Sequence, residues 1–426
     1  MDKDQFKYHN FNHLPSAYGD IKVSSKGKKY AVKFDNAADF SQSFYLFSKA
    51  FYASADLITN RMLDGQQIDE LDRYFFPVFY LYRHSLELLL KSIGFKTIVN
   101  KPDRICFLNE TFHNLNDILL YVKDRATIQR PTDEMLWLQK YFSNISSFDS
   151  ASDSFRYPYH IIPPKYDFGE TEYVYKRVFQ KQTHIDLIGE ANKMIAAYEI
   201  LENWYLDYID VDNIHKSTEY ISLTSDFLEE GGNYFEQSVV GYEYHHNEFY
   251  SYCSGYQECA NFLKQYLMGE WDNGNKIIGH LIYPMCYLYR NDVELLLKSI
   301  IYDFSVQPFQ KVLEILYTNK HRIINLFQYI EDNILDIYEL EKSDSYIINA
   351  KRYCSLLHNF DTDSSKFRYP VNRRCDPYQA SIRYYNFDEL SVFLDSLCNA
   401  IDGIHGEINS RKSALDEMAA EYASYY

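Results

Sequence analysis

Two stretches of this chain place a cation, an acid and a second cation at four-residue spacing. They are PVFYLYRHSLELLLKSI at residues 77–93 and PMCYLYRNDVELLLKSI at residues 284–300, and 12 of their 17 positions are identical. On a helix this spacing puts the three side chains in one row. The residues are Arg83, Glu87 and Lys91 in the first stretch and Arg290, Glu294 and Lys298 in the second.

A second block repeats in the same order. FDSASDSFRYP ends at Pro158 and FDTDSSKFRYP ends at Pro370, with seven of 11 positions identical. A proline disfavours the helical conformation of the residue before it, so the chain should turn within each FRYP segment. The blocks contain two arginines, Arg156 and Arg368, and begin with two aspartates, Asp149 and Asp361, that could pair with an arginine or form the turn.

The residues around the charged row are apolar on nearly all sides, which predicts a central helix where an unpaired charge is costly. One interpretation is a structural clamp in which Glu87 pairs with Arg83, Lys91 or Arg156. The other is an anion or nucleotide cleft that Arg83, Lys91 and Arg156 face. We expect the acid and the FRYP arginine of one unit to meet in space, Glu87 with Arg156 and Glu294 with Arg368.

These blocks lie in a duplicated helical unit, because the elements around them recur in the same order. Apolar periodicity predicts opening helices at residues 44–63 and 249–268, and closing helices at 184–209 and 387–408. His113 and His321 each open a further apolar helix. Short extended pieces are expected at 173–179 and 381–387, and a β-hairpin at 20–34. The predicted domains are an N-terminal extension at 1–35 and two helical units at 36–210 and 211–426.

Composition restricts the function. The formal net charge of −17 argues against broad, sequence-independent nucleic-acid binding, because that affinity comes from neutralised phosphates. Seven cysteines without a C-x-x-C pair predict free thiols in a reducing compartment, and no metal or cofactor is expected. The 42 tyrosines and 29 phenylalanines are interpreted mainly as packing, with a base-stacking platform as the alternative. No signal peptide or membrane span is evident, so we expect a cytoplasmic protein.

The order of these blocks resembles that of the HEPN superfamily (higher eukaryotes and prokaryotes nucleotide-binding domain). The resemblance covers roughly residues 40–205 and 245–410, and it depends on the E-L-L-L-K helix, the later histidine and R-Y-P in both copies. It implies an all-α fold of two tandem HEPN-like bundles that form an internal pseudo-dimer. The family includes metal-independent ribonucleases of toxin–antitoxin, antiphage and CRISPR systems, and also inactive members.

Ribonuclease members of the family carry an R-x4-6-H motif, in which arginine would stabilise phosphate charge and histidine would move a proton. Arg352 with His358 and Arg177 with His184 fit this spacing, but about 1.5 such pairs are expected by chance. Arg156 and His160 are one residue too close. The predicted catalytic residues are Arg156, His160, Arg352 and His358; the predicted ligand-binding residues are Arg83, Glu87, Lys91, Arg290, Glu294, Lys298 and Arg368.

Two functions therefore stay open. The first is a defence or stress protein that cleaves RNA, bound in a local basic cleft, with an antitoxin or defence component as protein partner. The second is a non-catalytic scaffold or ligand-sensing module that holds partners through its helical faces.

The pair His245–His246 has no metal-ligand spacing to other residues and is interpreted as structural.

Overall fold

A computed structural model describes residues 30–34, 39–125, 131–165, 172–209, 220, 222–241, 249–271, 278–378 and 383–424. In these ranges the chain forms twelve helices and three two-stranded antiparallel sheets. The predicted all-α class is confirmed at this level, with small strand pairs added to it.

None of the helices in the described ranges is long and apolar enough to cross a membrane.

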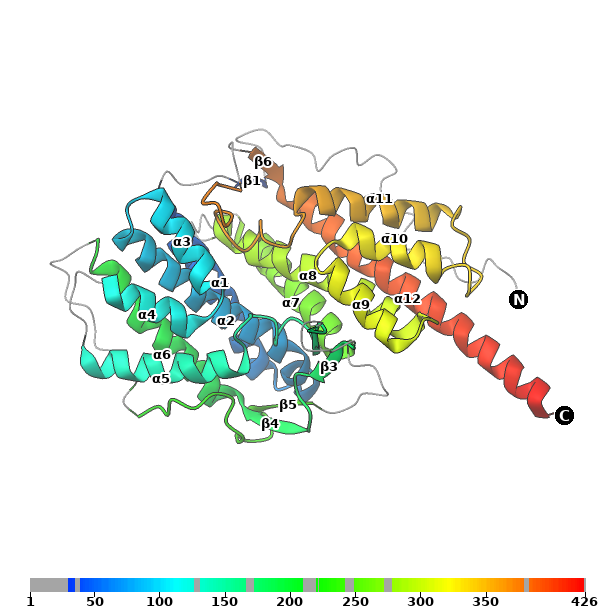
Figure 1. Ribbon diagram of the computed structural model, residues 1–426, viewed down its shortest axis with the longest axis horizontal. Helices are drawn as coiled ribbons and strands as arrows, with labels where there is room; N and C mark the ends of the chain where they lie inside the picture. The colour runs from blue at the N-terminus through cyan, green and yellow to red at the C-terminus, as the bar shows by residue number, and fades with distance from the viewer. Residues whose placement is uncertain are drawn as a thin grey trace.

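The helices follow the same order in the two repeats (Figure 1). The first repeat contains α1 (Phe40–Gly65), α2 (Ile68–Thr97), α3 (Lys101–Thr111), α4 (Leu115–Arg125), α5 (Thr132–Phe148) and α6 (Leu187–Leu206). The second contains α7 (Tyr250–Glu270), α8 (Ile278–Phe304), α9 (Phe309–Asn319), α10 (Ile323–Asn333), α11 (Ser345–Phe360) and α12 (Phe387–Ser424). The charged rows lie on α2 and α8.

Helices α2 and α8 form the centre of the molecule. In α2 every residue from Tyr74 to Phe95 is buried, as the apolar surroundings of the charged row predict. Helix α1 packs on both α2 and α8, and α7 packs on both α8 and α2, so the apolar core continues from one repeat into the other. The equivalent rings of Tyr80 and Tyr287 stack between the two central helices, with centroids 4.6 Å apart.

Local sequence explains where the helices begin and how closely they pack. Asp39 caps α1 by accepting a hydrogen bond from the Ser41 amide at 2.9 Å, and Asp186 caps α6 through the Gly189 amide at 3.0 Å. Gly255 on α7 lies against the Arg73 carbonyl of α2, where an added Cβ would be 2.1 Å from the oxygen. Glycine therefore permits the close contact between α2 and α7.

The short strands connect the two repeats. β1 (Ala31–Phe34) precedes α1 and pairs with β6 (Arg383–Asn386), which precedes α12. β5 (Gln237–Val240) precedes α7 and pairs with β4 (Thr183–Asp186), which precedes α6. The strand before each opening helix thus pairs with the strand before the other repeat's closing helix.

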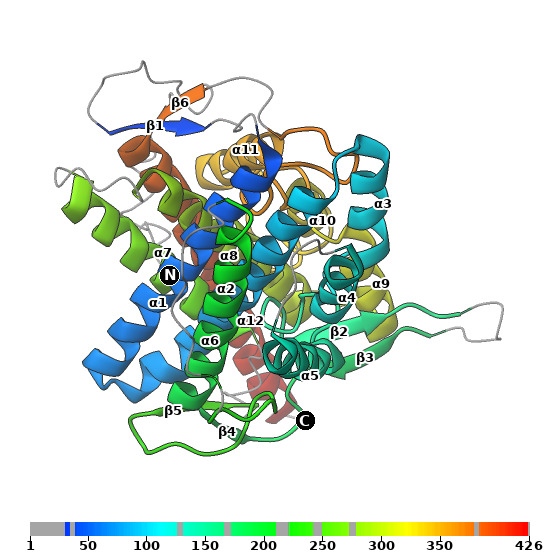
Figure 2. The same cartoon turned by 90° about the vertical axis from the view of Figure 1, so that its left-hand side faces the viewer.

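The remaining sheet is a hairpin. β2 (Tyr159–Ile162) follows the first FRYP segment and pairs with β3 (Val174–Arg177) (Figure 2). The extended pieces predicted at 173–179 and 381–387 are confirmed as β3 and β6. The predicted N-terminal hairpin is not: β1, its second arm, pairs with β6, and its first arm lies outside the described residues.

Candidate functional site: two composite charged centres

Glu87 lies at the centre of a buried polar cluster, which we call the Glu87 site. Its carboxylate accepts from Arg83 Nη1 at 2.7 Å and from Lys91 Nζ at 2.6 Å, the two neighbours expected along α2. His113 Nδ1 lies 3.0 Å from the same carboxylate. The fourth donor is the hydroxyl of Tyr369, at 2.8 Å, which comes from the second repeat.

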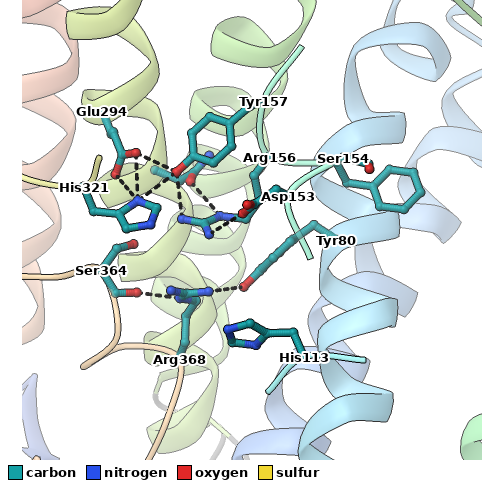
Figure 3. A network of polar contacts seen from close by, with 12 residues as sticks. Tyr80, His113, Asp153, Ser154, Arg156, Tyr157, Glu294, His321, Ser364 and Arg368 are labelled. Atoms are coloured by element: carbon teal, nitrogen blue, oxygen red, sulfur yellow. Dashed lines mark hydrogen bonds and ion pairs between the residues drawn. The ribbon is translucent and has the colours of Figure 1, made fainter. Parts of the chain in front are cut away.

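The same arrangement surrounds Glu294, at what we call the Glu294 site. Arg290 Nη1 and Lys298 Nζ donate at 2.9 and 2.7 Å, and His321 Nδ1 lies at 3.0 Å. Here the phenol comes from the first repeat, because Tyr157 donates to the carboxylate at 2.6 Å (Figure 3). Each site therefore combines side chains from both repeats.

The FRYP arginines cross between the repeats together with their tyrosines. Arg156 Nε donates to Asn291 Oδ1 of α8 at 3.3 Å, and its charge lowers the pKa of His321. Arg368 lies at the Glu87 site, where its charge acts on His113 and its Nη1 reaches the Tyr80 hydroxyl at 3.5 Å. The predicted pairs Glu87–Arg156 and Glu294–Arg368 are therefore wrong, because each segment turns onto the opposite central helix.

The clamp interpretation is correct for the charged rows themselves. Glu87 pairs with Arg83 and Lys91, and all three side chains are buried. Burial by itself would raise the pKa of Glu87, but the charge of Lys91, the hydrogen bond from His113 and the charge of Arg83 outweigh it and hold that pKa well below its usual value. The pKa of Glu294 is depressed for the same reasons. Both carboxylates are ionised at neutral pH.

The aspartates that begin the repeated blocks form the turns before the FRYP arginines. Asp149 Oδ1 accepts from the amides of Asp153 and Ser154 at 2.8 and 3.0 Å. Asp361 Oδ1 does the same for Ser365 and Lys366. Asp149 Oδ2 also lies 3.2 Å from Arg83 Nε. The turn role expected for both aspartates is confirmed, and Asp149 adds an ion pair.

His113 and His321 are the parts of these sites that reach solvent, with 23% and 30% of their side chains exposed. Burial lowers the pKa of both imidazoles, and the adjacent glutamate opposes that effect without reversing it. We assign the Nδ1 proton to the bond with the carboxylate, which leaves Nε2 as the basic atom of a neutral ring. Each site thus presents an oriented, neutral imidazole.

An unusual backbone conformation positions each histidine. The preceding residues, Phe112 and Lys320, have φ/ψ of 44°/−106° and 45°/−112°, which are rare values for residues with a side chain. The histidine carbonyls then accept from the buried arginines, Arg83 Nη2 to His113 O and Arg290 Nη2 to His321 O. Such strain persists only where surrounding contacts enforce it, and here it occurs at the same place twice.

Both predicted catalytic histidines lie outside the composite sites. His160 is on β2 with Nε2 3.2 Å from Ser154 Oγ. Arg352 and His358 are both on α11, where six positions turn the helix by about 240°, so the side chains leave different faces. His358 is half-buried, and burial and the charge of Arg290 lower its pKa. Of the four predicted catalytic residues, only Arg156 touches a composite site. His245 and His246 lie outside the described residues.

Tyr157, Tyr369, His113 and His321 are the residues that the site prediction left out. The signal for them was present, because the tyrosines lie inside the repeated FRYP segments and the histidines occupy matching places. Their identity in both copies pointed to a shared role. Only the crossing of the FRYP segments revealed which glutamate each tyrosine meets.

Comparison with protein-family models, with curated proteins and with solved structures finds no match for this chain. Among the residues that the structure describes, no three His, Cys, Asp or Glu side chains are grouped to hold a metal ion.

Proposed function

We propose that this chain comprises two HEPN-like units arranged as an internal pseudo-dimer. Reciprocal contacts support the arrangement: Tyr157 reaches Glu294 while Tyr369 reaches Glu87, and β1 pairs with β6 while β5 pairs with β4. Tyr80 stacks on its own counterpart, Tyr287, as expected at a pseudo-two-fold axis. A duplicated unit of this kind supplies internally the partner surface that a single unit gains by dimerising.

We further propose that the protein cleaves RNA without a metal ion, in a defence or stress context. The observation that carries this proposal is the repeated Glu–His pair with an arginine from the opposite repeat. A neutral imidazole held through Nδ1 can remove the proton from a ribose 2′-hydroxyl with Nε2. The 2′-oxygen then attacks the adjacent phosphorus, and the 5′-oxygen of the next nucleotide leaves and takes a proton from solvent water. The buried guanidinium stabilises the charge on the phosphate oxygens.

The test uses purified protein, labelled single-stranded RNA and transfer RNA, with a chelator present throughout. The double variant His113→Ala/His321→Ala should lower cleavage about 100-fold or more, the usual contribution of a general base, and the two single variants show which site carries the activity. His405→Ala is the matched control, because His405 is also half-buried beside a carboxylate, Asp303 at 3.2 Å.

The same assay decides between the composite sites and the residues predicted from sequence. If His160→Ala or His358→Ala abolishes cleavage while the double variant of His113 and His321 stays active, the catalytic centre lies elsewhere. A requirement for magnesium would contradict the metal-independent mechanism.

The second candidate is a non-catalytic module in which the charged centres fasten the two repeats together and a partner or ligand binds. The completeness of the Glu294 network favours it, since Arg290, Lys298, His321 and Tyr157 all contact one carboxylate. Under this hypothesis no RNA substrate is cleaved, and substitution at the sites changes stability or ligand binding alone.

A further inference from the structure

The two FRYP arginines differ in how far the protein neutralises them. All three nitrogen atoms of Arg156 donate hydrogen bonds, to Asn291 Oδ1, Asp153 Oδ1 and the Tyr157 hydroxyl. Arg368 is 5% exposed, and its hydrogen bonds to the residues that the structure describes go to the Ser364 carbonyl and the Tyr80 hydroxyl. Within the described residues, its Nη2 has no hydrogen-bond partner and no carboxylate oxygen lies within ion-pair distance.

Three sequence differences between the repeats cause this asymmetry. Aligning the FRYP segments places Ser365 where Asp153 stands, which removes the carboxylate partner, and Arg373 where Ile161 stands, which adds a cation. On the central helix, His84 replaces Asn291, and His84 Nε2 contacts the Arg368 carbonyl oxygen 3.2 Å away and not its guanidinium. The lack of a carboxylate beside Arg368 therefore follows from the residues that the sequence places around it.

The ion pairs of the two sites differ in which arginine the second carboxylate meets. At the Glu294 site, Asp153 pairs with the crossing arginine, Arg156. At the Glu87 site, the second carboxylate, Asp149, pairs with Arg83 of the central helix.

A further cation, Arg373, lies at the rim of the Glu87 site. Its guanidinium carbon is 4.8 Å from the ring centroid of Phe112, the residue before His113. Arg373 is exposed, and its charge contributes to the lowered pKa of Lys91. The solvent-facing edge of the site therefore carries positive charge as well.

We propose that the Glu87 site, and not the Glu294 site, binds one phosphate-type oxyanion, held by Arg368 with Arg373 and His113 at the open edge. A buried guanidinium without a counter-ion is unfavourable, and an anion that pairs with it reduces that free-energy cost. The planar guanidinium fork also matches the oxygen geometry of a phosphate group. The inference rests on the proposed function in that it names which of the two sites receives the phosphate of the substrate.

The decisive variant restores the missing carboxylate. Ser365→Asp should pair with Arg368 as Asp153 pairs with Arg156, and it should weaken phosphate binding at least about 10-fold. Asp153→Ser is the matched control, because it changes the equivalent position of the other repeat and leaves the Glu87 site intact. Titration calorimetry with inorganic phosphate should give one site per chain in the wild type, and Asp153→Ser should keep that site with the wild-type affinity.

The same titration with adenosine 5′-monophosphate distinguishes a nucleotide from free phosphate as the ligand. Tighter binding of the nucleotide, lost in Ser365→Asp, assigns the site to nucleotides; equal binding assigns it to the phosphate group alone. Equal binding of both ligands by wild type and Ser365→Asp overturns the inference, as does no binding by the wild type at millimolar ligand.

A second pair of variants covers the case in which Ser365→Asp does not fold. Arg373→Gln removes an exposed side chain at the rim and should weaken phosphate binding several-fold. Its neighbour Arg374 is also exposed, and Arg374→Gln should leave binding unchanged. Identical affinities for the two variants would contradict the proposed place of the anion.

Cleavage assays separate this inference from the proposed ribonuclease. Phosphate binding that Ser365→Asp abolishes, in a protein that cleaves no RNA, leaves the anion site standing and rules out the catalytic proposal. If Ser365→Asp and Arg373→Gln leave RNA cleavage unchanged, the activity does not use the Glu87 site. The ribonuclease proposal then stands, and the inference that this site receives the substrate phosphate is wrong.

Discussion

The Glu87 and Glu294 sites share one framework and differ in the groups around it. Both hold a glutamate between an arginine, a lysine and a histidine of one repeat and a tyrosine of the other. Among the residues that the structure describes, only the second matches its crossing arginine with a carboxylate, Asp153. The shared groups therefore join the repeats, and the groups that differ are those on which the proposed anion site depends.

The largest effect should come from the residues that the sites share. Glu87→Gln and Glu294→Gln each leave buried cations without their counter-ion, so each should lower the free energy of unfolding by about 3–5 kcal/mol. Urea unfolding followed by circular dichroism would measure both. A large loss for one variant and a negligible loss for the other would contradict the structural equivalence of the two sites.

The crossing tyrosines should show a smaller, unequal effect. A hydrogen bond to a charged group contributes about 1.5–3 kcal/mol, so Tyr157→Phe and Tyr369→Phe should both destabilise the protein. Tyr157→Phe should lower the stability more than Tyr369→Phe, because the Tyr157 hydroxyl also accepts a hydrogen bond from Arg156 Nη2 at 2.9 Å. Thermal melts of the two variants side by side test this order, and the reverse order would mean that Arg156 does not depend on Tyr157.

Asp292 on α8 offers a stabilising change. It is fully buried beside Cys398, and burial raises its pKa well above the usual value, whereas the equivalent residue on α2 is Ser85. The unfolded chain releases this proton above its ordinary pKa of about 4, so holding it costs more as the pH rises. Asp292→Asn should raise stability by about 1–2 kcal/mol at pH 7 and by less at pH 4, and a gain independent of pH would exclude this cause.

The smallest effect should come from His84, whose equivalent in the second repeat is Asn291 and not a histidine. Burial lowers its pKa well below the usual value, so the folded state keeps it neutral while the unfolded state takes up a proton below about pH 6.5. Stability should therefore fall as the pH drops through that range, by roughly 1 kcal/mol at pH 5.5. His84→Asn, which copies Asn291, should flatten this dependence in unfolding experiments at several pH values, and an unchanged slope would mean that His84 is not its cause.

Several features could be predicted from local sequence. The duplication, the central helices and the pairs of Glu87 with Arg83 and Lys91 follow from residue spacing, because residues four apart on a helix are neighbours. The turns at Asp149 and Asp361 follow from side chains that bond amides a few positions later. The pairing of β1 with β6 and of β5 with β4, each between the two repeats, could not be predicted, because the sequence of a short strand does not indicate which strand it will pair with.

The residue types and their spacing already show which positions are charged, buried and repeated. The sequence also contained the differences between Asp153 and Ser365 and between Asn291 and His84, although their meaning depended on their neighbours. The packing of the helices is what places Arg156 and Tyr157 with Glu294, and Arg368 and Tyr369 with Glu87. Contacts between elements 130 or more positions apart depend on how the helices pack. Local preferences, such as the turn before each proline, change the direction of the chain but do not determine which distant residue it will contact.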